Sequence, residues 1–124
     1  MIIVSDTQFD GQTAHRHDAL IERVSEWLLN EDSAWPLLDP SRRTEMLGQI
    51  IAEAELAGMV SERDFAVFCR ATILLRMAWT DFIAEPQNQE MLRDPSVEPN
   101  SKLRAWFHRC WTAAQRRARQ KAQA

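Results

Sequence analysis

The sequence predicts an all-α fold, in which a single domain forms a bundle of about five helices. The third helix is apolar and central, and the last helix is basic. Two observations predict this fold. Apolar residues recur at spacings of three and four along most of the chain, which is the period of a helix rather than a strand. The length of 124 residues, 45% of them hydrophobic and 27% charged, suits one globular domain spanning 1–124.

Residues 1–12 are expected to form a flexible arm, because Gly11 and the polar run 6–8 do not suit a buried element. One helical face follows, which predicts a first helix over about 13–30 with Thr13 as its cap. The dipeptide Trp35-Pro36 then predicts an extended turn, because a residue before proline avoids the helical conformation. The apolar face of this helix consists of Leu20, Ile21, Val24, Trp27 and Leu28.

The second helix is predicted to begin at Asp39-Pro40. Aspartate can cap free N–H groups, and proline at the first helical position has no N–H to satisfy. Gly58 is predicted to end this helix, because glycine accepts the left-handed conformation of a helix stop. The buried face is expected to contain Met46, Leu47, Ile50, Ile51, Ala54 and Ala57.

The third helix is predicted over about 62–83, with Ser61 as its cap and Asp64 three residues later. Its apolar residues cover most of the circumference, and a helix of this kind belongs in the middle of a bundle. They are Phe65, Phe68, Cys69, Ile73, Leu74, Leu75, Met77, Ala78, Trp79 and Phe82.

Pro86 is predicted to separate the third helix from a short fourth helix over about 86–93. The last helix is predicted to begin with Asn100 or Ser101 as its cap. No large apolar residue follows position 115, so residues 115–124 are expected to form a basic tail that frays or waits for a partner. One apolar side of the last helix is formed by Leu103, Trp106, Phe107, Cys110, Trp111 and Ala114.

Charge is divided unevenly along the chain. Residues 99–124 contain seven of the 15 Lys and Arg residues and no Asp or Glu. The first 98 residues contain all 18 acidic residues and eight basic ones, a net charge of −10. This asymmetry favours a basic arm that contacts nucleic acid, an acidic protein partner, or the acidic body of its own chain.

No motif in the sequence indicates catalysis, and we expect no catalytic, cofactor-binding or metal-binding residues and no cofactor. His15 and His17 lie two apart, so on a helix they point to different faces. The pair Glu22 and Glu26 has no accompanying metal-binding histidine motif and is expected to face solvent. Cys69 and Cys110 are the two cysteines, and both lie among apolar helical residues as small hydrophobic side chains do.

The sequence begins with only four apolar residues and has no apolar run of the ~20 residues that a membrane-spanning helix needs. We therefore expect no secretory signal, no membrane partner and a cytoplasmic location.

The absence of catalytic motifs and the surplus of five Trp residues predict a non-enzymatic protein-interaction module. The alternative is a small nucleic-acid-binding regulator that uses the basic last helix, although the acidic body would repel a polyanion. A homodimer, in which each arm docks on the other acidic body, is a third option. The candidate partner-binding residues are Trp106, Arg109, Trp111, Arg116, Arg117 and Arg119.

Four stretches of the chain resemble a group of small helical proteins. They are Val60-Ser61-Glu62-Arg63-Asp64-Phe65, Trp79-Thr80-Asp81-Phe82, Met91-Leu92-Arg93-Asp94-Pro95 and Lys102-Leu103-Arg104-Ala105-Trp106. The proteins of this group are encoded in bacterial type VI secretion clusters, beside effector adaptor proteins. The resemblance implies an accessory chaperone, co-chaperone or inhibitor that binds an adaptor or effector in the cytoplasm. It implies no functional residue, because the shared motifs are structural.

Overall fold

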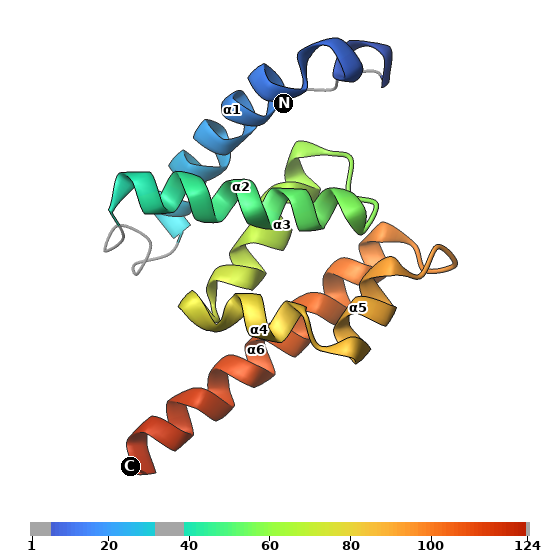
Figure 1. Ribbon diagram of the computed structural model, residues 1–124. Helices are drawn as coiled ribbons and strands as arrows, with labels where there is room; N and C mark the ends of the chain where they lie inside the picture. The colour runs from blue at the N-terminus through green and yellow to red at the C-terminus, as the bar shows by residue number, and fades with distance from the viewer. Residues whose placement is uncertain (1–5, 32–38, 124) are drawn as a thin grey trace.

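The computed structural model describes residues 6–31 and 39–123. It confirms the all-α prediction: six α-helices and one 3-10 helix, with no strand in the described ranges. The helices are α1 (Asp6–Glu31), α2 (Pro40–Leu56), α3 (Glu62–Ile73), α4 (Trp79–Ile83), α5 (Pro86–Arg93) and α6 (Pro99–Gln123), with the 3-10 helix η2 (Arg76–Ala78) before α4. In Figure 1, α3 lies at the centre, α1 and α2 lie at one end, and α6 crosses the other end. None of these helices is long and apolar enough to cross a membrane.

Helix α1 begins earlier than predicted. It starts at Asp6, so residues 6–12 are helical and the predicted arm over 1–12 is wrong for that part. A single glycine inside a helix costs only about 1 kcal/mol relative to alanine, so Gly11 does not end it. The predicted apolar face is confirmed: Leu20, Val24 and Leu28 are buried, and Ile21 and Trp27 are partly buried against the core. Residues 1–5 and the predicted turn at Trp35-Pro36 lie outside the described ranges.

Both ends of α2 lie where the sequence predicts them. Pro40 is the first helical residue, and Gly58 has a φ of +95° just after the helix. The side chain of Asp39 caps no backbone N–H, however, because its carboxylate instead accepts a hydrogen bond from the Ser41 hydroxyl at 3.2 Å. The predicted buried face is confirmed and contains Met46, Leu47, Ile50, Ile51, Ala54 and Ala57.

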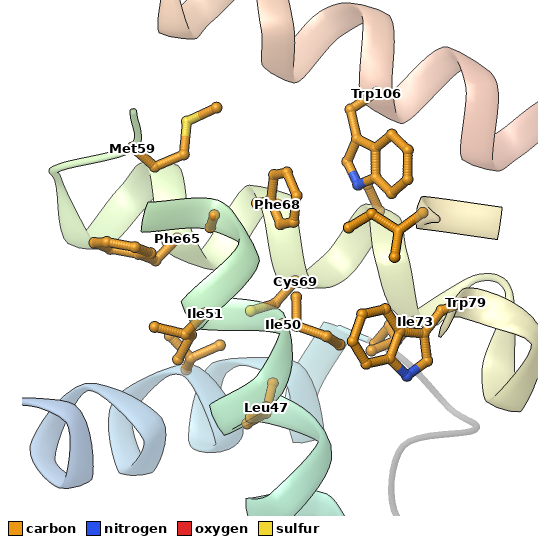
Figure 2. Close-up of a cluster of buried hydrophobic side chains, with 14 of the residues drawn as sticks. Leu47, Ile50, Ile51, Met59, Phe65, Phe68, Cys69, Ile73, Trp79 and Trp106 are labelled. Atoms are coloured by element: carbon orange, nitrogen blue, oxygen red, sulfur yellow. The ribbon is translucent and has the colours of Figure 1, made fainter. Parts of the chain in front are cut away.

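Helix α3 is the centre of the core, as predicted. The Ser61 hydroxyl caps it by accepting a hydrogen bond from the Asp64 N–H at 3.1 Å. The helix contacts α1, α2 and α6, and Figure 2 shows its apolar side chains among those of α2 and α6. Its buried residues are Phe65, Phe68, Cys69, Ala71, Thr72 and Ile73.

The single helix predicted over 62–83 is wrong, because the chain breaks after Ile73. The N–H groups of Leu74 and Leu75 bond three residues back, and Arg76 adopts the left-handed conformation at φ +54°. The Arg76 guanidinium then donates to the carbonyl oxygen of Ile73 at 2.7 Å. Thr72 and Ile73 are β-branched, which weakens a helix at this point.

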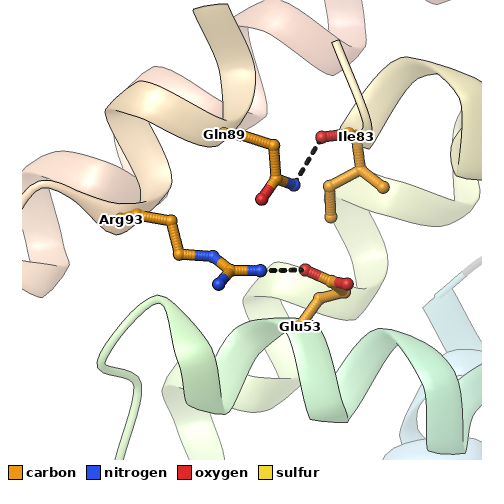
Figure 3. Close-up of polar contacts among 4 residues, drawn as sticks. All are labelled: Glu53, Ile83, Gln89 and Arg93. Carbon is orange, nitrogen blue, oxygen red and sulfur yellow. Dashed lines mark hydrogen bonds and ion pairs between the residues drawn. The ribbon is translucent and has the colours of Figure 1, made fainter. Parts of the chain in front are cut away.

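Three polar contacts hold helix α5 against the earlier helices, and Figure 3 draws two of them. The third is the Asn88 side-chain amide, which donates to the carbonyl oxygen of Phe82 at 2.7 Å. The Gln89 side-chain amide donates to the carbonyl oxygen of Ile83 at 2.6 Å. The Arg93 guanidinium lies 3.5 Å from a Glu53 carboxylate oxygen of α2. The exposed ion pair adds little stability, so the contact mainly orients α5.

Helix α6 begins at Pro99, one or two residues before the predicted caps Asn100 and Ser101. The Lys102 N–H bonds the carbonyl oxygen of Glu98, so the helical ladder already includes this turn. Proline suits the first position because its missing N–H would have no partner there. The helix continues to Gln123, so the basic tail is helical to that residue. The expected fraying of its last turns stays a prediction.

Candidate interaction surface

The apolar residues of α6 are divided between two faces. Leu103, Trp106 and Cys110 are buried against the core. Phe107 and Trp111 are 38% and 49% exposed, although both were predicted to lie on the same apolar side as the buried set. These two side chains are four residues apart, so they lie one above the other on a helix. The apolar side of α6 is therefore wider than the part of the helix that packs against the core.

Trp106 belongs to the core and not to the interaction surface, contrary to its prediction as a contact residue. It is fully buried, and its ring stacks on Phe68 at a centroid distance of 5.6 Å. Its indole N–H donates to the Thr72 hydroxyl at 2.9 Å, which satisfies the one polar group of the side chain. Figure 2 shows this indole between α6 and α3.

Two cations of the C-terminal region have internal partners. Arg109 is half-buried, and its guanidinium donates to the carbonyl oxygen of Gln87 at 3.0 Å and to Asn88 Oδ1 at 2.7 Å. Lys102 is buried and donates to the carbonyl oxygen of Ala57 at 3.0 Å, just after the end of α2. A cation is favourable there because it opposes the negative end of the helix dipole. Arg109 is therefore a structural residue here, and its predicted contact role has no support.

The three remaining predicted arginines, Arg116, Arg117 and Arg119, are exposed on the tail of α6. All side chains from Gln115 to Ala122 are exposed. Figure 1 shows this part of α6 extending beyond the other helices to the C-terminus. The tail thus presents its cations to solvent or to a partner.

A hollow of about 710 Å³ lies between α3 and α6, and we call it the α6 hollow. Trp111 is the only predicted contact residue that lines it. The sequence analysis did not identify Arg63 and Val67 as lining residues. Periodicity assigns them to the central helix but does not show which other helix lies beside them. The lining residues are Arg63, Asp64, Val67, Asn100, Leu103, Arg104, Phe107, His108 and Trp111.

The charged groups of the α6 hollow are mainly basic. Arg63 and Arg104 are exposed and form no hydrogen bond or ion pair with any residue in the described ranges. Asp64 is the one carboxylate that lines the hollow. Two free guanidinium groups beside two exposed aromatic rings form a surface that suits both apolar and anionic contacts.

A second hollow of about 490 Å³ adjoins the first and lies between α1 and α3. Arg63 and Val67 line both hollows. Trp27 lines the second hollow, with the Arg70 guanidinium 5.9 Å from its ring centroid. Arg23 is paired there with Glu62 at 3.7 Å. Of the basic side chains that line the two hollows, Arg63 and Arg104 have no polar partner in the described ranges, and both line the α6 hollow.

The remaining candidate chemical groups form no site. The side chains of His15 and His17 lie outside the described ones, while Glu22 and Glu26 are exposed on α1. No group of three His, Cys, Asp or Glu side chains within the described residues could hold a metal ion. Cys69 and Cys110 are buried free thiols, and burial raises the pKa of each far above its ordinary value. Both act as small apolar side chains, as predicted.

No protein-family model, curated protein or solved structure matches the chain. The geometry of the helices is therefore the basis for assigning the surface. The resemblance to type VI secretion accessory proteins stays a prediction.

Proposed function

We propose that the protein is a non-enzymatic binding module that docks another protein on the exposed face of α6. The exposed pair Phe107 and Trp111, beside the free guanidinium groups of Arg63 and Arg104, carries this proposal. Aromatic and arginine side chains dominate the binding energy of protein interfaces. A large indole that stays half-exposed gains most when a partner covers it.

The basic tail supports the same function through electrostatics. Its cations lie beyond the acidic body, where they attract a partner of negative charge and orient it before docking. The attraction is screened by salt, so it weakens as ionic strength rises.

We propose an effector or an effector adaptor of a type VI secretion cluster as the partner, with this protein acting as an accessory chaperone or co-chaperone. The resemblance supports this identity. Lys102, Leu103 and Trp106 of its last motif are all buried, so the motif holds α6 in place. The proposed contact residues Phe107 and Trp111 lie just after it, on the side of α6 that the core leaves exposed.

The nucleic-acid alternative has less support. Lys102 and Arg109 are bound within the protein, which leaves fewer cations of α6 for phosphate contacts. The first 98 residues also carry a net charge of −10, which repels a polyanion.

A pull-down of the tagged protein from nuclease-treated extract of its own cells tests the function. We expect a stoichiometric protein that co-elutes with the wild type and is lost with Trp111→Ala. Truncation of a central interface tryptophan costs at least about 2 kcal/mol, or roughly thirtyfold in affinity. Leu29→Ala is the matched control, because Leu29 is an exposed apolar side chain of α1 that lines neither hollow.

The same pull-down also has an outcome that contradicts the proposal. If only nucleic acid co-elutes before nuclease treatment and nothing remains afterwards, the protein-binding proposal is wrong. Steep loss of that binding with salt would then assign α6 to phosphate contacts.

A further inference from the structure

We propose that the α6 hollow and the adjoining face of the tail receive an acidic amphipathic helix of the partner. Apolar side chains of that helix cover Phe107 and Trp111, and its carboxylates meet Arg104, Arg63, Arg119 and Lys121. This inference rests on the proposed function and names the chemistry of the bound segment.

The shape of the hollow suits a helix. Its walls are two helices, α3 and α6, and Val67 and Leu103 lie between them. An amphipathic helix binds such a groove through anchors spaced three or four residues apart. Phe107 and Trp111 provide a surface of matching period, because they lie one turn apart on α6.

The direction of each tail side chain follows from the helix period of about 100° per residue. Ala118 and Ala122 lie within about 20° of Trp111 around the axis, so the face of the hollow continues along the tail as small residues. Arg119 and Lys121 lie about 80° to either side of that line. Arg116 and Arg117 lie more than about 100° away and point to the opposite side.

Together these residues form a strip with aromatic or small side chains along most of its centre and one cation on each edge of the tail. Arg104 lies close to the centre line, about 20° from Trp111, at the end nearest the hollow. The strip runs from Arg104 to Lys121, which is about 26 Å of helix. A partner helix of about 17 residues matches this length. Carboxylates along its flanks would pair with the edges, whereas lysine or arginine there would be repelled.

The charge at the start of the strip is also mainly positive, with Asp64 as the one carboxylate that lines it. Arg63 and Asp64 lie in the first turn of α3, and Asn100 lies in the first turn of α6. The positive ends of two helix dipoles therefore meet at this end of the hollow and add to the two free guanidinium groups. This end fits the carboxylates or the negative C-terminal end of the bound helix.

A displayed library of helix-forming 18-residue peptides, randomised on one face and its flanks, tests the inference with the full-length protein as bait. We expect enriched peptides with large apolar residues three or four apart and Asp or Glu at the flanking positions. A synthesised winner, labelled and titrated by fluorescence anisotropy, should bind Trp111→Ala at least tenfold more weakly. It should bind Leu29→Ala as it binds the wild type.

Two charge-reversed variants provide the matched comparison. Arg119→Glu with Lys121→Glu should weaken the peptide at least fivefold, and a peptide with lysine in place of its flanking acids should regain affinity for this variant. Arg116→Glu with Arg117→Glu changes the net charge equally on the opposite side and should weaken binding less than twofold at 0.15 M salt, where the Debye length is about 8 Å.

Three outcomes would overturn the inference: no enriched peptide, enrichment of basic flanks, or equal loss of affinity in the two charge-reversed variants. A wild-type dimer that Trp111→Ala dissociates would assign the strip to a second copy of the chain and also overturn it. If a partner protein still co-elutes with Trp111→Ala, the α6 hollow is not the binding site, but the proposed binding function is retained.

Discussion

The indole N–H of Trp106 and the hydroxyl of Thr72 form a hydrogen bond of 2.9 Å between α6 and α3, and both side chains are fully buried. The same hydroxyl donates to the carbonyl oxygen of Phe68 at 2.7 Å. The one hydroxyl of Thr72 is therefore the hydrogen-bond acceptor for a tryptophan of another helix and the donor to a carbonyl oxygen of its own helix. This contact fixes the rotation of α6, and hence the direction in which Phe107 and Trp111 point.

Thr72→Val should destabilise the protein by about 1–3 kcal/mol, because the valine keeps the shape and leaves the buried indole N–H without an acceptor. Urea unfolding followed by circular dichroism measures the change. Thr80→Val, at an exposed position of α4, is the control and should change stability by less than about 0.5 kcal/mol. Equal stability of Thr72→Val and wild type would show that the hydrogen bond contributes nothing.

At position 76, glycine should give a more stable protein than alanine. Arg76 has a φ of +54°, a conformation that costs a residue with a Cβ about 1 kcal/mol more than glycine. Arg76→Gly and Arg76→Ala both remove the guanidinium, so their difference isolates the backbone. We expect Arg76→Gly to be the more stable of the two by about 1 kcal/mol in thermal and urea unfolding. If Arg76→Ala were as stable as Arg76→Gly, the left-handed conformation at position 76 would not strain the backbone between α3 and η2.

The Asp94 carboxylate accepts hydrogen bonds from the hydroxyl of Ser96 at 2.6 Å and from its N–H at 2.9 Å. These bonds lower the pKa of Asp94, with the side-chain bond as the largest cause. Since the folded pKa lies below the unfolded one, the contribution to stability is present above the unfolded pKa and is lost as pH falls through the folded pKa. Ser96→Ala should raise the pKa of Asp94 towards its ordinary value in an NMR titration, whereas Ser101→Ala should leave it unchanged.

The tail of α6 should exchange its amide hydrogens faster than the part of α6 around Trp106. Residues 115–122 are exposed, so only the local helix protects their N–H groups. Hydrogen exchange followed by mass spectrometry should show nearly unprotected amides there and strong protection over 103–110. Binding of an acidic helical peptide should slow exchange in the tail. Equal protection of both parts in the free protein would contradict the expected fraying.

Much of the fold could be predicted because local residues decide it. Pro40, Ser61, Gly58 and Pro86 set helix ends through their own backbone and capping properties, and the structure agrees at each. The break at Arg76 could not be predicted, because the apolar pattern continues through it.

The candidate site was less accessible to sequence reasoning. Trp106 and Trp111 have the same chemistry and lie within one apolar arc, so periodicity alone could not separate the buried ring from the exposed one. Their different exposure depends on where α3 contacts α6. The roles of Lys102 and Arg109 likewise depend on carbonyl groups 45 and 22 residues away along the chain.

The placement of Trp106 on the last helix also has a consequence for the timing of synthesis. A ribosome completes α1 to α5 before α6 emerges, so the apolar surface of α3 beside Phe68 stays open to water until then. Trp106, which closes this surface, and the exposed rings of Phe107 and Trp111 leave the ribosome within five residues of one another. The exposed aromatic pair on α6 therefore takes its place only when Trp106 closes the core, so the proposed binding surface and the core form together.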